Sequence, residues 1–350
     1  MKRGMIFRVS VLVVAALLCA CAGRGRKYKP THSVLPAGAP LDARSLEVLA
    51  QKPAEIAQAD KAKPFRFKKE QDCRVLFAAS VNKTEPCLFS LNTASGMTFV
   101  NTEHFDVDKL AKKAKKNHIV DSDQAGVVQK DAFVIYRADT IEFGGLSVRG
   151  ANFQIKYADT DDKDVFDRSV LDMCGGIGTS VLAPLVVSVD YPNSEISFLP
   201  PNLFVHKSTP VAAIPFQIAP DKGNIPYIEL SFANGKKAQF RLDTASSESL
   251  LLNDATALEL DLVSDIDGIY SIPAVSAAGY RMGAQTASRT IQPYNTAGCG
   301  LFQKYRMVLD YPARKVYLEE SVPSKTPGQP GLPGQYDMLN GSGAAPVSPF

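Results

Sequence analysis

The chain has 350 residues, a net charge of +3 and 45% hydrophobic residues. That charge is far too small for a dedicated nucleic-acid-binding protein, and the apolar fraction is that of a globular protein rather than a disordered one. A polytopic membrane protein is also excluded, because only one apolar run is long enough to concern a membrane.

The N-terminus has the pattern of an export signal. Three basic residues precede an apolar run at positions 9–18, which is too short to span a bilayer and has the size of a signal-peptide core. The run ends in Leu-Cys-Ala-Cys at positions 18–21, which resembles the lipobox of bacterial lipoproteins. The resemblance implies removal of residues 1–20 and a lipid on Cys21 that attaches the protein to a membrane. A transmembrane anchor and an ordinary secretory signal are the alternatives.

The residue after Cys21 is Ala22, and not the aspartate that resembles an inner-membrane retention signal. In a bacterium with two membranes this favours the outer membrane. We therefore expect a cell-envelope lipoprotein that faces the periplasm or the cell surface, with no nucleic-acid partner.

Two segments flank the expected folded part. Residues 21–70 contain eleven basic and five acidic residues, a net charge of +6, and we interpret them as a flexible basic tether that lifts the folded part off the membrane. Residues 41–49 have the pattern of a short helix within it. Residues 323–350 are dominated by Pro, Gly and Ser, which predicts a disordered tail. Folded structure is therefore expected between residues 71 and 322.

The pattern between these segments is mostly that of β-strands. Residues 133–136 and 225–232 are rich in β-branched and aromatic residues, which favour strands. Asn234-Gly235 follows the second run and predicts a type I′ hairpin turn. The exception is residues 107–116, a lysine-rich stretch that predicts a basic surface helix, either simply solvated or in contact with an acidic partner.

The sequence repeats two landmarks in the same order. Residues 88–95 (Leu-Phe-Ser-Leu-Asn-Thr-Ala-Ser) align with residues 239–246 (Gln-Phe-Arg-Leu-Asp-Thr-Ala-Ser), and the Asp-Tyr-Pro at 190–192 aligns with that at 310–312. Either match alone could arise by chance, but two matches in the same order are much harder to explain that way. The repeat therefore indicates two duplicated lobes. We place them at residues 71–202 and 203–322.

The second copy of the first landmark resembles a known active-site motif. Phe-Arg-Leu-Asp-Thr-Ala-Ser at 240–246 is similar to the Asp-Thr-Gly-Ala/Ser turn of aspartic proteases, especially bacterial retropepsin-like ones. Residues 176–182 resemble the second glycine loop of that family, and residues 295–302 are a weaker counterpart. The resemblance implies an all-β fold of two pseudo-symmetric aspartic-protease-like lobes around a central cleft. Thr93 and Thr244 resemble the threonines whose hydroxyls brace the two active-site turns.

The catalytic positions depart from the family. Its chemistry requires two carboxylates that share one proton, one acting as base toward a water and the other polarising the scissile carbonyl. The second lobe supplies Asp243, but the first supplies Asn92, whose amide cannot ionise or hold the shared proton. Ala94 and Ala245 also stand where the family usually has glycine, and each adds a methyl group at a tight turn. These departures predict that the usual dyad mechanism is lost.

Other residue types suggest structural roles. Asp190 and Asp310 follow β-like runs and are typical of hairpin turns. No CxxC motif or Cys/His cluster occurs, and the four histidines share no ligand or triad spacing, so we expect no metal and no cofactor.

An exported compartment permits disulfides. Four cysteines in the expected lobes allow three complete pairings, between which the sequence does not choose. A bridge between the lobes through Cys174 and Cys299 is one possibility, and reduced, buried cysteines are another. The four are Cys73, Cys87, Cys174 and Cys299.

Three hypotheses for function follow, and they leave open whether the chain is an enzyme. The leading one is an envelope lipoprotein whose degenerate cleft binds a peptide or an envelope protein without cutting it. The first alternative is an active aspartic endopeptidase, in which Asp243 acts with a non-standard partner or with Asp243 of another chain. The second is an envelope scaffold or assembly lipoprotein that uses residues 109–116 as its contact surface.

Overall fold

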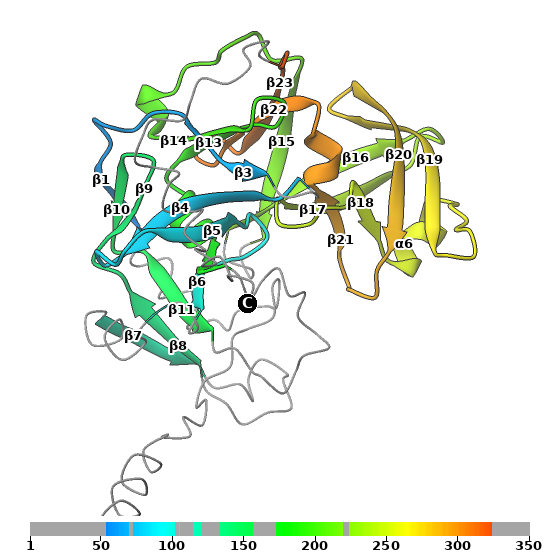
Figure 1. The fold of residues 1–350 in the computed structure, drawn as a ribbon. Coiled ribbons are helices and arrows are strands. Elements are labelled where there is room, and N and C mark those ends of the chain that lie inside the picture. The colour runs from blue at the N-terminus through cyan, green and yellow to red at the C-terminus, as the bar shows by residue number, and fades with distance from the viewer. Residues whose placement is uncertain are drawn as a thin grey trace, which may run out of the picture.

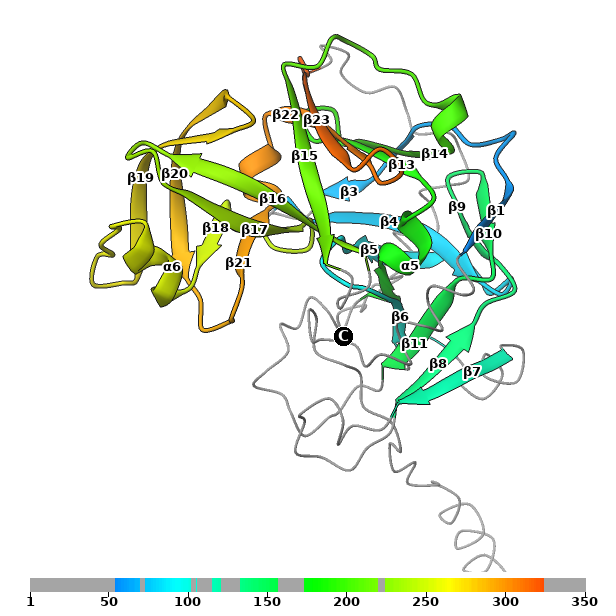
Figure 2. The same cartoon turned by 180° about the vertical axis from the view of Figure 1, so that it is seen from behind.

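The computed structural model describes residues 54–69, 73–101, 105, 115–120, 133–156, 173–219 and 224–323. Within them the chain is almost entirely β and forms two lobes, one a curled half-barrel sheet and the other a closed barrel (Figures 1 and 2). The expected two-lobed all-β fold is confirmed. The predicted signal peptide, the lipidation at Cys21, the helix at 41–49 and the tail beyond residue 323 lie outside the described residues.

The first lobe is one sheet in the order β1-β10-β9-β4-β5-β12-β6-β11-β8-β7, with β3 beside β4. A short helix, α5 (Thr179–Leu182), follows β12, the last strand of this lobe in the chain. The strands are β1 (Glu55–Gln58), β3 (Lys68–Lys69), β4 (Val75–Val81), β5 (Cys87–Leu91), β6 (Thr98–Asn101), β7 (Lys115–Val120), β8 (Phe133–Arg137), β9 (Ile141–Phe143), β10 (Leu146–Arg149), β11 (Asn152–Lys156) and β12 (Gly175–Ile177).

The second lobe closes into a barrel because β16 pairs with both β17 and β19. Its helical turns are α6 (Asp254–Glu259) and the 3-10 helix η4 (Cys299–Phe302). The strands are β16 (Ile225–Phe232), β17 (Lys237–Asp243), β18 (Leu250–Leu252), β19 (Ile269–Ala277), β20 (Tyr280–Arg289) and β21 (Asn295–Gly298).

A six-stranded antiparallel layer joins the lobes, in the order β2-β14-β13-β22-β23-β15 (Figure 1). A 3-10 turn, η2 (Pro201–Leu203), follows β14. The strands are β2 (Phe65–Arg66), β13 (Val186–Asp190), β14 (Glu195–Leu199), β15 (Ala212–Ala219), β22 (Tyr305–Asp310) and β23 (Lys315–Glu320).

The register of this interlobe sheet is that of a two-fold repeat. Aligning the two Asp-Tyr-Pro landmarks makes Ser188 the counterpart of Val308, and these two residues lie opposite one another at the centre of the β13–β22 pairing. Asp190 lies opposite Arg306, two residues along in each direction. A residue pairs with its own counterpart only at a two-fold axis, so the axis between the lobes passes through this point.

Aromatic side chains fill the core beneath the sheet. Phe198 of β14 packs with Phe77 of β4 and Phe143 of β9, with ring centroids 5.0 and 4.6 Å apart. In β9 the pattern of buried Ile141, exposed Glu142 and buried Phe143 follows the period of two expected for a half-buried strand. The strands of the first lobe and of the interlobe sheet therefore share one core.

The tether expected at residues 21–70 is wrong for residues 54–69, which form strands of the folded part. The Phe67 N–H donates to the Ser194 carbonyl at 3.0 Å, as the Phe216 N–H donates to the Arg314 carbonyl at 3.0 Å in the second lobe. The net charge of this segment does not reveal that exposed and buried residues alternate in it. Arg66 and Lys68 are exposed, whereas Phe67 between them is only 4% exposed. Cationic side chains on the outer face of an edge strand do not prevent its inner face from packing.

Two local predictions are also corrected. The β16–β17 hairpin forms, but only Gly235 of the turn has a positive φ, +80°, whereas a type I′ turn needs two such residues. The turn is instead closed by the Gly235 N–H, which donates to the Phe232 carbonyl at 2.9 Å, so Ala233 and Asn234 are its central residues. The helix expected at 107–116 is wrong at its end, because pairing with β8 places residues 115 and 116 in strand β7, and residues 107–114 lie outside the described residues.

Candidate functional site

The ends of β5 and β17 meet through a reciprocal pair of threonines. The Thr93 hydroxyl donates to the Leu242 carbonyl at 2.9 Å, and the Thr244 hydroxyl donates to the Leu91 carbonyl at 2.8 Å. The Thr244 N–H donates to the Thr93 hydroxyl at 3.1 Å, and the Thr93 N–H to the Thr244 hydroxyl at 3.3 Å. Thr93 is 0% and Thr244 1% exposed. The two repeated turns are thus fixed against one another in the interior.

A glycine supports each turn from behind. Strand β12 runs parallel to β5, and β21 runs parallel to β17, in the same register. A Cβ on Gly178 would lie 2.3 Å from the Met97 carbonyl oxygen, and one on Gly298 would lie 2.2 Å from the Glu248 carbonyl oxygen. Only glycine allows this close approach. Residues 295–302 are therefore the structural counterpart of the first glycine loop.

Asn92 and Asp243 occupy equivalent positions in the two turns. Asn92 Oδ1 accepts the Ala94 N–H at 3.2 Å, and Asp243 Oδ1 accepts the Ala245 N–H at 3.0 Å. Neither alanine has a positive φ, so the backbone of these turns does not require glycine. In the described part of the chain the hydrogen bonds of Asn92 and Asp243 stay within their own lobes, and none joins the amide to the carboxylate.

The partner of Asp243 is a buried arginine. Arg241 and Asp243 lie two residues apart on one face of β17, and Arg241 Nη2 is 3.2 Å from Asp243 Oδ2. The guanidinium carbon also lies 3.9 Å from the centroid of the Tyr294 ring. The Arg241 side chain is 6% exposed and that of Asp243 is 14% exposed. Asp243 is therefore paired with a cation from its own lobe.

Burial raises the pKa of Asp243 above its ordinary value, and the charge of Arg241 and the backbone N–H groups of Ala245 and Ser246 oppose that rise.

The role of Arg241 was not predicted from the sequence. The sequence pattern that could have indicated it is Arg-Leu-Asp at the strand end, because residues two apart on a strand share a face. The first lobe has Ser90 at the position equivalent to Arg241. The Ser90 hydroxyl donates to the Gly175 carbonyl at 3.4 Å, so this position is uncharged in the first lobe.

Two cavities among the described residues lie elsewhere. One of about 360 Å³ lies against β1, β10, β9 and β4, and another of about 220 Å³ lies beside Arg137 and Arg149. Neither is lined by Asn92 or Asp243. The central cleft expected between the lobes stays a prediction.

Two disulfides form, and one of them joins the lobes. Cys73 bridges Cys299 with Cα atoms 6.1 Å apart, and Cys87 bridges Cys174 with Cα atoms 6.0 Å apart. The suggested Cys174–Cys299 bridge is therefore wrong, although a bridge between lobes exists. The Cys299 N–H donates to the Ser246 carbonyl at 2.9 Å, so the interlobe bridge is attached directly behind the Asp243 turn.

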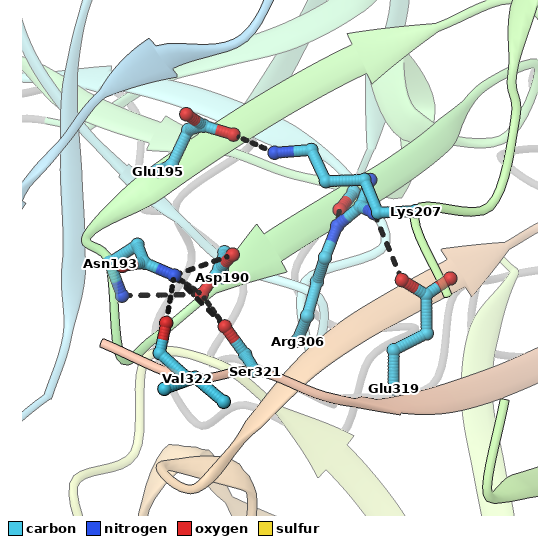
Figure 3. A network of polar contacts seen from close by, with 9 residues as sticks. Asp190, Asn193, Glu195, Lys207, Arg306, Glu319, Ser321 and Val322 are labelled. Carbon is cyan, nitrogen blue, oxygen red and sulfur yellow. Dashed lines mark hydrogen bonds and ion pairs between the residues drawn. The ribbon is translucent and has the colours of Figure 1, made fainter. Parts of the chain in front are cut away.

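Asp190 and Asp310 hold turns, as expected. Asp190 Oδ1 accepts the Asn193 N–H at 3.2 Å, and Asp310 Oδ1 accepts the Ala313 N–H at 2.9 Å. Asp190 also accepts the Ser321 hydroxyl at 2.7 Å, so the first-lobe turn holds the end of β23 (Figure 3).

A buried charge cluster lies beside this turn and was not expected from the sequence. The Glu319 side chain, which is 1% exposed, lies 2.9 Å from Arg306 Nη1 (Figure 3). It also lies 2.6 Å from His206 Nδ1. Arg306 Nε donates to the Ser188 hydroxyl at 2.7 Å. Because these residues are far apart in the sequence, no spacing indicated them. The cluster attaches the segment between the lobes to the interlobe sheet.

No protein-family model matches the chain, and no curated protein matches it. The described residues contain no group of three or more histidine, cysteine, aspartate or glutamate side chains that is suited to hold a metal ion. No helix of the described part is long and apolar enough to cross a membrane.

Proposed function

We propose that this protein is a membrane-anchored bacterial lipoprotein with an aspartic-protease-like fold and a degenerate active site. It binds a peptide or an envelope protein between its lobes and does not cut it. The lipobox-like residues before Cys21 support export and lipid attachment, and Ala22 favours the outer membrane where there are two. The ordered repeat and the residues of the two turns support the likeness to aspartic proteases.

The observation that carries the loss of catalysis is the pairing of Asp243 with Arg241, 3.2 Å apart, while the equivalent turn holds Asn92. In the family's chemistry one carboxyl must be a base and the other an acid, and each sets the charge of the other. The Asn92 amide has no titratable proton to share and does not ionise. Arg241 is a permanent cation, so it cannot take the part of the protonated carboxyl either.

The frame around this position supports a binding role. The reciprocal bonds of Thr93 and Thr244 and the two glycine supports hold the turns in fixed register even though the acid–base pair is absent. Asp243 keeps 14% of its side chain exposed, which leaves an acceptor for a ligand N–H. A rigid frame with partly exposed amide and carboxylate groups suits hydrogen bonding to a peptide backbone.

The test is proteolysis and peptide binding by the full chain, purified from membranes in detergent. We expect no cleavage of unfolded casein between about pH 3 and pH 8, and binding of fluorescently labelled casein peptides that Asp243→Ala weakens. Asp267→Ala, at an exposed aspartate of the same lobe, is the matched control and should bind normally. Cleavage that Asp243→Ala abolishes and Asp267→Ala preserves would overturn the proposal.

One observation favours the alternative of an active endopeptidase, namely the raised pKa of Asp243, since perturbed carboxyls concentrate at catalytic sites. Pairing of Asp243 with its copy in a second chain predicts activity that disappears on dilution. A strictly monomeric active species would exclude that arrangement.

The membrane anchor is tested separately. Cys21→Ser should move the protein from the membrane fraction to the soluble fraction, whereas Cys19→Ser should leave it in the membrane. Equal partitioning of the two variants would count against lipid attachment at Cys21.

A further inference from the structure

The larger cavity lies in the first lobe, apart from the two turns. Its volume is about 360 Å³, within the range of small-ligand pockets. Strands β1, β10, β9 and β4, which lie side by side in Figure 1, form its floor. It is therefore a candidate site that the function proposed for the turns does not use.

One row of polar residues crosses this floor. Gln58 lies opposite Ser147, Ser147 opposite Glu142, and Glu142 opposite Ser80, in the registers of three consecutive antiparallel pairings. Directly opposed residues point to the same face of a sheet. All four line the cavity, so an amide, two hydroxyls and a carboxylate converge on it from four different strands.

The turn after β1 contributes Lys61 to the same cavity. Lys61 lines it, and the Lys63 N–H donates to the Gly144 carbonyl at 3.3 Å, which fixes the turn over the β9–β10 hairpin. A Cβ on Gly145 would lie 2.2 Å from the Lys61 carbonyl oxygen, so this close approach requires glycine. The position of Lys61 at the rim is thus built into the backbone.

The charges of the cavity are not used by the protein itself. Within the described part of the chain, Lys61 and Glu142 form no ion pair with each other or with any other residue. Lys61 and Glu142 both line this hollow without pairing, and residues of opposite charge so placed are suited to a ligand that carries both charges.

We propose that this cavity binds a zwitterionic ligand of the size of an amino acid or a short peptide. The free amino group of the ligand lies toward Glu142 and its carboxylate toward Lys61, while Ser80, Ser147 and Gln58 hydrogen-bond the atoms between. Because none of these residues belongs to the Asp243 turn, the proposal does not depend on the function of that turn.

The test is isothermal titration of the full chain with glycine, diglycine and triglycine. Two blocked forms of the tightest binder probe the charges: an N-acetyl form without the ammonium and an amide form without the carboxylate. We expect millimolar binding of a zwitterion and at least about tenfold weaker binding of either blocked form.

The pocket variants then assign the two charges. Glu142→Gln should abolish the preference for the free amine and keep the preference for the free acid, and Lys61→Gln should do the reverse. Glu259→Gln and Lys304→Gln, at exposed positions of the other lobe, should behave as the wild type.

Either of two results would overturn the proposal: no heat of binding for any of the three zwitterions at concentrations up to about 10 mM, or blocked forms that bind as tightly as the free ones. Unchanged preferences in both pocket variants would place the binding elsewhere and would refute it equally. The substitutions are at exposed side chains, so thermal unfolding should show the variants to be folded.

Discussion

Thr93 and Thr244 make equivalent hydrogen bonds with one another's turns across 151 positions of sequence. Each hydroxyl donates to a carbonyl two residues before the other threonine and accepts the other's backbone N–H. Both are buried, so the bonds are shielded from water. The relationship fixes the two turns against one another through a few specific polar contacts.

Replacing Thr93 by alanine should therefore be costly. Thr93→Ala leaves the Leu242 carbonyl and the Thr244 N–H without their partner in the interior, which should lower the free energy of unfolding by about 2–4 kcal/mol. Urea denaturation measures this loss. Thr93→Ser keeps the hydroxyl and should recover most of it, whereas equal losses for serine and alanine would show that the methyl group, and not the hydrogen bonds, carries the effect.

The Arg241–Asp243 pair should behave as one unit. Arg241→Met and Asp243→Asn each leave one charge of a largely buried pair without its partner, and each should destabilise the fold by about 2–4 kcal/mol. The double variant should lose less than the sum of the two by about 1–3 kcal/mol. A double-mutant cycle by urea unfolding measures this coupling, and strict additivity would contradict the pairing.

The pH dependence of stability follows from Asp243 itself. Burial raises its pKa from the ordinary value of 3.8, so the native state holds this proton more tightly than the unfolded state does. That contribution to stability is present in full below the ordinary pKa and is lost as pH rises through the raised native pKa. The difference in unfolding free energy between the wild type and Asp243→Asn should therefore fall as pH rises from about 3.

Urea unfolding at intervals between about pH 3 and pH 8 measures this difference. Asp267→Asn, at an exposed site, should give a flat difference over the same range. A difference that grows with pH for Asp243→Asn would mean that Arg241 outweighs burial.

The interlobe disulfide should contribute strongly to stability. The Cys73–Cys299 bridge closes a loop of 226 residues, for which the chain-entropy relation gives about 5 kcal/mol. The double variant Cys73→Ala, Cys299→Ala should therefore unfold at a much lower urea concentration. Mass spectrometry of the non-reduced, digested protein checks the pairing, and a peptide linking Cys174 to Cys299 would contradict it.

Much of the architecture was predictable because it is written in local pattern. The Leu-(Asn or Asp)-Thr-Ala-Ser and Asp-Tyr-Pro landmarks marked the strand ends of both lobes, and residues 225–232 form a strand as predicted. The tether prediction failed because it used the net charge of the segment and did not consider how exposed and buried residues alternate along it. In Arg66-Phe67-Lys68 a basic composition concealed a buried phenylalanine, and the described part of the expected tether contains three short strands.

The decisive part of the site was less predictable because it depends on which side chains share a face. Asn92 and Asp243 could be read directly from the aligned motifs. The pairing of Arg241 with Asp243 required knowing that β17 continues through both residues without a bulge. The row from Gln58 to Ser80 arises from three registers between strands, and such registers leave no trace in a single sequence.

The interlobe sheet also determines how the molecule comes apart. Its central pairing joins β13, from the first half of the chain, to β22, from the second, and further pairings extend the sheet to β2 and β15 at its edges. Neither half therefore completes its hydrogen bonding alone, and cutting the chain between the lobes would leave each fragment with an open, aggregation-prone strand edge. The two lobes should accordingly fold and melt as one cooperative unit.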